Sequence, residues 1–222
     1  GAPEVILHLC TKLTASRRKN SLRWFQSQGN EGKRVLAVAA YRQIYTPNIF
    51  NIKKVPFEYI GSISFTDPVK KSALPAIRKA KELGVTIKLL TGDSKEVSTY
   101  VAKQTGLIQN TNQVMTAQEF EALSVEEQHV AVINCHVFAR TSPLQKFTII
   151  KLLQETNEVG FLGEGINDAP ALKIANVGLV VDDASDISRE AADILLLRKS
   201  LLVIMDGIKE GREVFTNTVK YI

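Results

Sequence analysis

Residues 159–172 read VGFLGEGINDAPAL and are the segment most informative about the fold class. Its apolar start, Val159 to Leu162, has the length and composition of a buried strand. A loop bracketed by Gly163 and Gly165 follows, and Asn167-Asp168 precedes a short helical pattern. A strand that leads through a polar, glycine-containing loop into a helix is typical of α/β proteins with a parallel sheet.

The same alternation of short apolar runs and helical patterns extends from about Val69 to the end of the chain. Further strands are predicted at 85–90, 137–139, 177–181 and 194–197. Helices are predicted from Asp67-Pro68 to Gly84, at 95–105, at 143–156, near Ser185 and from Leu201 onward. Two capping boxes, Thr116 with Glu119 and Ser124 with Glu127, predict short helices in an insertion.

The first part of the chain shows a different pattern. A helix is predicted to start within 5–10, residues 17–29 are polar, and 34–41 is a strong strand candidate. Residues 53–57 begin a connection to the rest. We therefore expect two domains, 1–62 and 63–222.

The bulk composition is that of a globular protein, since 45% of the 222 residues are hydrophobic and 23% are charged. The net charge of +5 arises from 28 basic and 23 acidic residues that are interspersed. The densest basic cluster, residues 17–19, has no aromatic residues interleaved with it for base stacking. Nucleic acid is therefore not an expected partner, and a solvated surface or a small anionic ligand fits better.

The cysteines and histidines show no metal-ligand spacing. We expect Cys10 and Cys135 to be buried, reduced thiols of a cytosolic protein. No apolar run approaches the ~20 residues needed to span a bilayer. The start of the chain does not resemble a signal peptide, so the segment is expected to be soluble.

Three polar clusters directly follow predicted strands: Thr91-Gly92-Asp93, Arg140-Thr141 with Lys146, and Gly163 to Asp168. Ligands in open α/β sheets sit beyond the carboxyl ends of the strands. Hydroxyl and ammonium groups can neutralise phosphoryl oxygens, and carboxylates can hold Mg²⁺. Singly, each cluster is explained by a turn, a solvated lysine or a helix cap. Three in series predict a phosphate site.

The segments that carry this chemistry resemble those of one family. Residues 163–172, GEGINDAPAL, resemble the hinge-motif signature GDGxNDxPAL of P-type ATPases. Thr91-Gly92-Asp93 resembles their TGD motif. Residues 138–146, FARTSPLQK, resemble the segment with their active-site lysine.

The first part of the chain extends the resemblance. Asp67-Pro68 matches the start of the hinge between the nucleotide-binding and phosphorylation domains of P-type ATPases. Residues 1–4, GAPE, resemble the remainder of the KGAPE motif. Residues 34–37, RVLA, are similar to the strand that supplies an arginine to the ATP phosphates. The resemblance covers essentially the whole chain in the right order.

The resemblance implies a Rossmann-like parallel sheet of haloacid-dehalogenase type in the phosphorylation domain, 63–222. Residues 1–62 would be the C-terminal part of a smaller α+β nucleotide-binding domain. The implied function is a cytosolic part of an ATP-driven cation pump, with ATP and Mg²⁺ as cofactors and a parent protein in the membrane. Residues 186–201 look most like the magnesium-transporting branch, with calcium pumps as the alternative. The transported cation would bind elsewhere in the parent protein.

The resemblance implies a role for each residue that matches a motif of P-type ATPases. The residues implied to handle the phosphoryl group are Thr91, Lys146, Asn167 and Asp168. Those implied to contact the nucleotide are Gly1, Arg34, Asp67, Gly92, Asp93 and Arg140. The implied metal ligands are Glu164 and Asp168.

The sequence departs from the family pattern in two respects. The DKTGT motif with the phosphorylated aspartate is absent, and we expect it upstream of Gly1. The chain would then be an inactive fragment that lacks the first strand of its sheet, with an unpaired edge or a gap in its place. Glu164 stands where the family has a Mg²⁺-ligating aspartate, and its extra methylene shifts the carboxylate by about 1.5 Å. Either the site adjusts or metal binding weakens, because Mg²⁺ demands near-octahedral geometry.

Two other classes of function remain open. A stand-alone phosphatase of the haloacid-dehalogenase superfamily would need a DxD nucleophile motif near its start, and none is present. A non-catalytic nucleotide-binding or interaction module would need no nucleophile at all.

Overall fold

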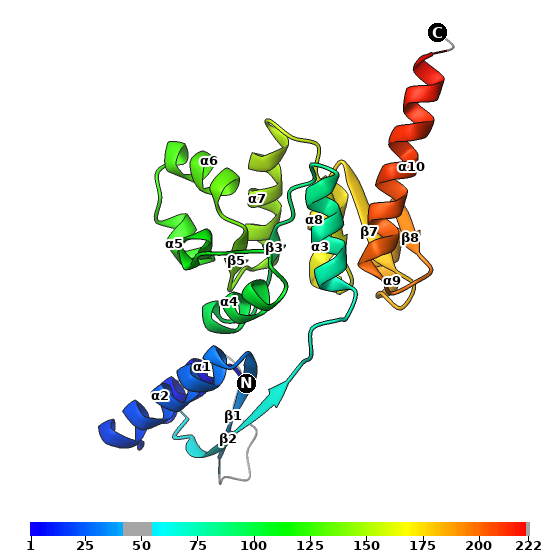
Figure 1. Ribbon diagram of the computed structural model, residues 1–222. Helices are drawn as coiled ribbons and strands as arrows, with labels where there is room; N and C mark the ends of the chain where they lie inside the picture. Colours follow the sequence, from blue (N-terminus) through cyan, green and yellow to red (C-terminus); the bar gives the residue numbers. More distant parts are fainter. Residues whose placement is uncertain (42–54, 221–222) are drawn as a thin grey trace. The chain divides into compact units, whose positions relative to one another are not determined.

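The computed structural model describes residues 1–41 and 55–220. The chain divides into two compact units, Gly1–Pro68 and Val69–Ile222, and each unit is considered by itself (Figure 1). The dividing point lies beyond residue 62 because the strand β2 (Glu58–Thr66) continues through that position in register with β1 (Lys33–Ala40). The connection expected at 53–57 lies partly outside the described residues.

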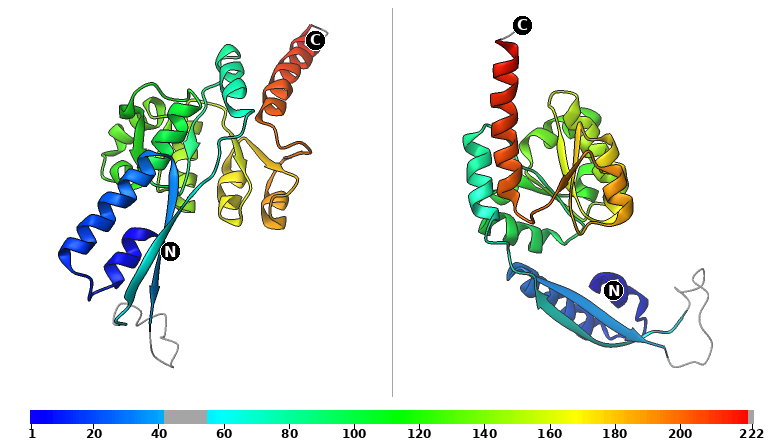
Figure 2. Two further views of the ribbon diagram at one scale, coloured as in Figure 1. Left: turned by 60° about the horizontal axis from the view of Figure 1, so that its bottom comes forward. Right: turned by 90° about the vertical axis from the view of Figure 1, so that its right-hand side faces the viewer.

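The first unit is a two-stranded antiparallel sheet with helices on one face. The helices α1 (Pro3–Leu9) and α2 (Ala15–Asn30) cover the β1–β2 ribbon (Figure 2). The helix predicted within 5–10 and the strand predicted at 34–41 are confirmed. Neither α2 nor β2 is predicted from the sequence. The helix α2 buries only Phe25 and Gly29 and therefore lacks an apolar period.

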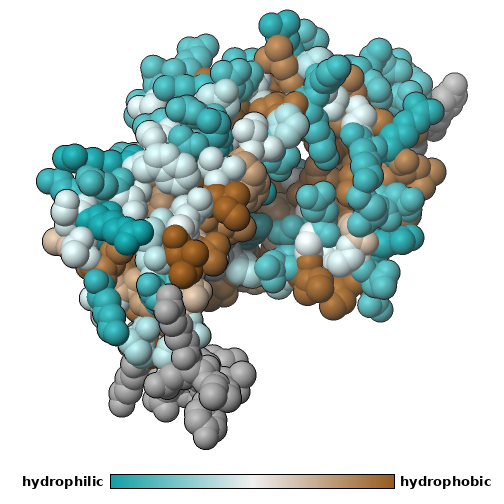
Figure 3. All heavy atoms as spheres, turned by 90° about the horizontal axis from the view of Figure 1, so that it is seen from below, coloured by the Kyte–Doolittle hydropathy of each residue, from teal (hydrophilic) through white to brown (hydrophobic). Residues whose placement is uncertain are grey.

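The other face of the ribbon is apolar and open among the described residues. Side chains alternate between the faces of a strand, and Ala37 is buried under the helices while its neighbours point away. The exposed hydrophobic side chains of the ribbon are Leu36, Val38, Ile60, Ile63 and Phe65. Figure 3 shows hydrophobic side chains, in brown, at the surface of the molecule seen from below.

The second unit contains two parallel sheets. One has the order β3-β5-β4, with bounds Leu89–Leu90, Val137–Ala139 and Val114–Thr116. The other has the order β6-β7-β8, with bounds Gly160–Gly163, Val177–Val181 and Ile194–Leu196. Within the described part of the chain, β3 and β6 each pair on one side only. The predicted α/β class with parallel strands is confirmed.

Helices connect these strands. Their bounds are α3 Ala73–Glu82, α4 Lys95–Gln104, α5 Ala117–Glu121, α6 Val125–Asn134, α7 Pro143–Gln154, α8 Ala169–Ile174, α9 Asp186–Ala191 and α10 Leu201–Val219. Two 3₁₀ turns are η2 (Thr111–Gln113) and η3 (Ile166–Asp168). Both predicted capping boxes are present, and Ser142 with Gln145 forms another at the start of α7.

Two predicted elements differ from the structure. Only the last two residues of the predicted strand 85–90 are paired, because the neighbouring strand β5 is short and begins at Val137. The helix expected from Asp67-Pro68 begins later, at Ala73. It ends before Gly84, which has a positive φ of 68°, as predicted for a residue after a helix C-terminus.

The core lies between the sheets and their helices. Phe120 and Phe138 meet edge to face with their ring centroids 5.6 Å apart in the cluster that packs α6 and α7 onto β5. Ala76, Ala80 and Met205 join α3 to α10. Both cysteines are buried and unpaired, as expected. Among the residues described, no helix is long and apolar enough to cross a membrane.

Lys88 provides a titration test of this packing. Its Nζ donates to the carbonyl oxygens of Ile133 and Cys135, at 2.9 and 2.6 Å, and burial lowers the pKa of the Lys88 ammonium from 10.5 to about 8. We expect an NMR titration of its ε-methylene to have a midpoint near pH 8, with the resonance assigned by its absence in Lys88→Arg.

The same shift affects stability. The folded-state pKa of Lys88 lies below the unfolded value. The protonated form of Lys88 is therefore less favourable in the folded state than in the unfolded state. The free energy of unfolding, relative to Lys88→Met, should rise as the pH increases from about 8 towards 10.5. A Lys88 midpoint near 10.5 would contradict the burial seen here.

Candidate functional site

The three predicted polar clusters follow the carboxyl ends of β3, β5 and β6. Pairing of β3 with β5 brings the first two clusters together. The backbone N–H of Thr141 donates to the carbonyl of Thr91, and that of Arg140 donates to the carbonyl of Asp93, both at 2.9 Å. The loops after these two strands therefore form one hydrogen-bonded unit.

An ion pair joins the second cluster to the third. Lys146 lies near the start of α7, where Ser142 caps the helix and Pro143 occupies its first turn. Its Nζ is 2.7 Å from Oδ1 of Asp168, and the two side chains are only 14% and 15% exposed. Because both charges are largely withdrawn from water, each needs the other as a partner.

The second oxygen of the Asp168 carboxylate is bound by the backbone of the glycine loop, residues 163–165. Oδ2 accepts hydrogen bonds from the backbone N–H groups of Glu164 and Gly165, at 3.2 and 3.3 Å. Burial by itself would raise the pKa of the Asp168 carboxyl, but the hydrogen bond and charge of Lys146 and these two N–H groups hold it below its usual value. Asp168 is therefore an anion that fixes the loop.

Gly163 allows this close approach. A Cβ atom on Gly163 would lie 2.7 Å from the Cβ of Asp168, closer than any side chain tolerates. Ser188 of α9 is fully buried, and its hydroxyl donates to the carbonyl of Gly165 at 2.7 Å. The sequence analysis missed Ser188, whose only sequence signal is its place three residues after the helix cap Ser185.

The loop after β5 is strained. Arg140 has φ of 58°, in the left-handed region that costs a residue with a side chain about 1–2 kcal/mol. Next to it, the hydroxyl of Thr141 is buried and has no hydrogen-bond partner among the described residues. Strained backbone and unsatisfied polar groups concentrate at functional sites.

The remaining predicted residues of this unit lie in the loops that follow β3 and β6. The Thr91 hydroxyl accepts a hydrogen bond from the N–H of Asp93 at 3.1 Å, while Gly92 is exposed. Asn167 is exposed in η3. Glu164 is exposed and, with Asp168, lines a pocket of about 270 Å³ that also includes Lys70 and Lys199.

The donor set for a metal is small. No group of three or more histidine, cysteine or acidic side chains gathers at one point in the part of the chain that is described. Two carboxylates, from Glu164 and Asp168, line one pocket. Mg²⁺ is commonly held by one or two carboxylates together with waters and phosphate oxygens, so this donor set fits Mg²⁺ when other oxygen ligands contribute.

The nucleotide-contacting residues predicted in the first unit lie along β1 and β2. Arg34 and Asp67 form an exposed ion pair at 3.7 Å. Gly1 is held beside β1, because its ammonium group donates to the carbonyl of Ala37 at 2.9 Å and its carbonyl accepts from the Ala37 N–H. These residues belong to a different unit from Gly92, Asp93 and Arg140.

Several known proteins resemble this chain in sequence. The sequence profile of haloacid dehalogenase-like hydrolases matches residues 3–176. A Magnesium-transporting ATPase, P-type 1, of Salmonella typhimurium is 39% identical over 233 residues, which cover 100% of this chain and 26% of that protein. The protein of the same name from Escherichia coli is 46% identical over 163 residues, 73% of this chain and 18% of that protein. A Probable cation-transporting ATPase F of Mycobacterium bovis is 33% identical over 237 residues, 100% of this chain and 26% of that protein. The chain thus spans about a quarter of the length of the first of these relatives.

Substitution of Gly163 tests whether the loop depends on the position of Asp168. Gly163→Ala should lower the free energy of unfolding in urea by about 1–3 kcal/mol, because the new methyl group displaces the carboxylate from Lys146. The matched control is Gly165→Ala, whose Cβ would lie 3.8 Å from the nearest atom and whose φ of −99° suits alanine. Equal losses for both variants would contradict the argument.

The difference in the free energy of unfolding between wild type and Gly163→Ala should depend on pH, because the Asp168 carboxyl titrates. Because its pKa is depressed in the folded state, its stabilising contribution is complete above the ordinary value of 3.8 and is lost as the pH falls through the folded-state pKa. The gap between wild type and Gly163→Ala should therefore narrow in acid.

The unsatisfied hydroxyl of Thr141 predicts a stabilising substitution. Thr141→Val keeps the shape of the side chain and removes a buried polar atom that has no partner within 1–41 and 55–220, so it should raise stability by up to about 1 kcal/mol. Thr105→Val is the control, because the buried hydroxyl of Thr105 donates to the carbonyl of Val101 at 2.9 Å. That variant should lose about 0.5–1.5 kcal/mol. A loss for Thr141→Val as large as for Thr105→Val would show that its hydroxyl is satisfied.

Proposed function

This chain belongs to the haloacid dehalogenase-like hydrolase family, and we propose that it is a cytosolic segment of an ATP-driven cation pump of the P-type. In this proposal Val69–Ile222 is most of the phosphorylation domain, and Gly1–Pro68 is part of the nucleotide-binding domain. The similarity to magnesium-transporting ATPases over the whole chain supports the assignment and favours Mg²⁺ as the transported ion.

The observation that carries the proposal is the ion pair between Lys146 and Asp168 at the carboxyl end of β6. It holds a largely buried ammonium group at the sheet edge where a phosphoryl group would bind. An ammonium group already desolvated and fixed can stabilise charge on phosphoryl oxygens without reorganising during the reaction.

Each site residue then has a proposed role. Thr91 and Lys146 hold the phosphoryl oxygens, and Asn167 and Asp168 complete their surroundings. Mg²⁺ bound through Glu164 and Asp168 would neutralise phosphoryl charge. The residues proposed to contact ATP are Gly1, Arg34, Asp67, Gly92, Asp93 and Arg140.

The nucleophile is proposed to lie in another segment of the parent protein. The 222 residues contain no DKTGT motif, and covalent phosphoryl transfer of this kind needs an aspartate. Among the described residues, β3 and β6 each have a side that pairs with no other strand, and the strand that carries this aspartate can pair there.

The decisive experiment uses the parent protein. It should form an acid-stable acyl phosphate from ATP in the presence of Mg²⁺, whereas the isolated chain should show no turnover. Lys146→Ala should reduce phosphoenzyme formation about 100-fold or more, as for loss of one preorganised charge donor. Lys151→Ala, an exposed lysine on the same helix, is the matched control. Phosphate release by the isolated chain well above its own Lys146→Ala variant would overturn the proposal.

The same assay tests the metal role of Glu164. Glu164→Gln should raise the Mg²⁺ concentration needed for phosphoenzyme formation, while Glu164→Asp should not. The same Mg²⁺ dependence for wild type and Glu164→Gln would mean that this carboxylate does not hold the metal.

A further inference from the structure

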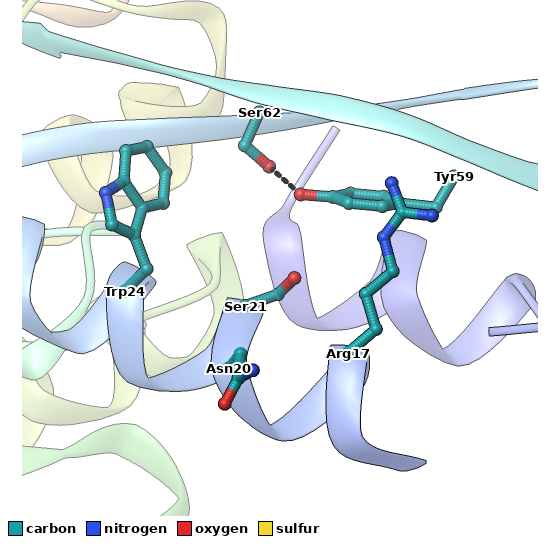
Figure 4. A pocket seen from close by; sticks show the side chains of 6 residues that line it. All are labelled: Arg17, Asn20, Ser21, Trp24, Tyr59 and Ser62. Carbon is teal, nitrogen blue, oxygen red and sulfur yellow. Dashed lines mark hydrogen bonds between the residues drawn. The ribbon is translucent and has the colours of Figure 1, made fainter. Parts of the chain in front are cut away.

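A groove of about 340 Å³ lies in the first unit between α2 and β2. Figure 4 shows the side chains that line it, which are Arg17, Asn20, Ser21, Trp24, Tyr59 and Ser62. The groove is shallow and open to solvent, so it would cover only part of a ligand. None of the residue roles proposed above uses this groove.

Arg17 is positioned for binding by an aromatic ring. Its guanidinium lies over the ring of Tyr59, 5.8 Å from the centroid (Figure 4). The Tyr59 hydroxyl is in turn hydrogen-bonded to Ser62 at 2.7 Å, which fixes the ring. A stacked guanidinium still presents its N–H edge, and less side-chain entropy is lost when an anion binds to it.

The hydrogen-bond donors and the positive charge of the groove favour an anionic ligand. No acidic side chain lines it, and its polar residues all carry hydrogen-bond donors. The helix α2 contains four basic residues, Arg17, Arg18, Lys19 and Arg23, and no aspartate or glutamate. Among the described residues, the Arg17 guanidinium forms no ion pair with a carboxylate.

Trp24 adds a flat apolar surface at one end. The residue is 39% exposed, and its ring meets that of Phe25 edge to face, with the ring centroids 5.9 Å apart. An exposed indole beside a cationic groove is a platform on which a planar ring can stack. The stacking of Arg17 on Tyr59 has no signal in the sequence, because the two residues lie far apart in the chain.

The groove lies on the opposite face of the ribbon from Arg34. Ser62 pairs with Ala37 and Tyr59 pairs with Ala39, both on the face covered by the helices. Arg34 alternates to the other face, where it is exposed. A ligand in the groove would therefore not occupy the positions proposed for ATP.

We propose that this groove binds a small oxyanion attached to a planar ring, of the size of a nucleoside monophosphate. The phosphate or carboxylate oxygens accept hydrogen bonds from Arg17 and from Asn20 or Ser21 of α2. The ring lies against Trp24. This binding does not depend on the assignment of the chain to a pump.

The experiment follows the fluorescence of Trp24, which is the only tryptophan in the chain and so reports on the groove directly. The intact chain is titrated with AMP, with adenosine as the ring alone and with ribose 5-phosphate as the anion alone. AMP should quench the fluorescence saturably, and each partial ligand should bind about tenfold or more weakly. Benzoate tests whether a carboxylate can replace the phosphate, and competition with AMP would place both at one site.

Substitutions locate the binding. Arg17→Gln should weaken AMP binding about tenfold or more, because one charge-assisted contact is lost. Arg23→Gln, an exposed arginine on the same helix outside the groove, removes the same charge and should change the affinity less than about twofold. Calorimetry with Trp24→Leu should show weakened AMP binding but unchanged ribose 5-phosphate binding.

Three results would overturn the proposal. One is the absence of saturable quenching by AMP. Another is an equal loss of affinity in Arg17→Gln and Arg23→Gln, which would indicate a diffuse electrostatic effect. The third is a loss in Arg34→Gln without a loss in Arg17→Gln, which would place the ligand on the opposite face and assign it to the site proposed for ATP.

Discussion

The carboxylate of Asp168 is the group on which the geometry of the site depends. One oxygen compensates the largely buried ammonium of Lys146, and the other accepts two backbone N–H groups of the loop after β6. A buried charge without a partner is strongly destabilising. The start of α7 and the glycine loop are therefore fixed by one side chain, and the absence of a side chain at Gly163 is what admits it.

Two energetically unfavourable features lie directly after β5. Arg140 adopts a left-handed backbone conformation, and the buried hydroxyl of the next residue, Thr141, has no hydrogen-bond partner in the part of the chain that the structure describes. The strands β3 and β6 each have one free side among the residues described. Backbone groups at a free edge can accept another strand. This part of the unit thus combines the ion pair of Lys146 and Asp168, the strained backbone of Arg140 and strand edges that can accept another strand.

The first unit illustrates how a two-stranded sheet separates two surfaces. Alternation along β1 and β2 places Ala37 and Ser62 under the helices and Leu36 and Ile63 on the opposite, exposed face. The helix face gains a groove lined by hydrogen-bond donors, whereas the other face is mostly apolar. The two faces therefore favour different kinds of contact.

Features that depend on residues close together in the chain could be predicted without the structure. The capping boxes at Thr116 and Ser124 span three residues, and the strand at 177–181 is a continuous apolar run, so both were predictable. The position of each polar cluster after a strand followed from the same local patterns. The match of those clusters to a family motif identified the haloacid dehalogenase-like family, which the comparisons confirm.

The tertiary structure alone decided the contacts between residues distant in the chain. No sequence signal predicted the pairing of β2 with β1, the shortness of β3 or the stacking of Arg17 on Tyr59. The place of Ser188 three residues after Ser185 did not predict that it anchors the loop. Each depends on which surfaces meet when the chain packs. A local pattern specifies the conformation of a segment, but the partner of a buried charge, a strand edge or an aromatic ring is specified only by the fold that brings the segments together.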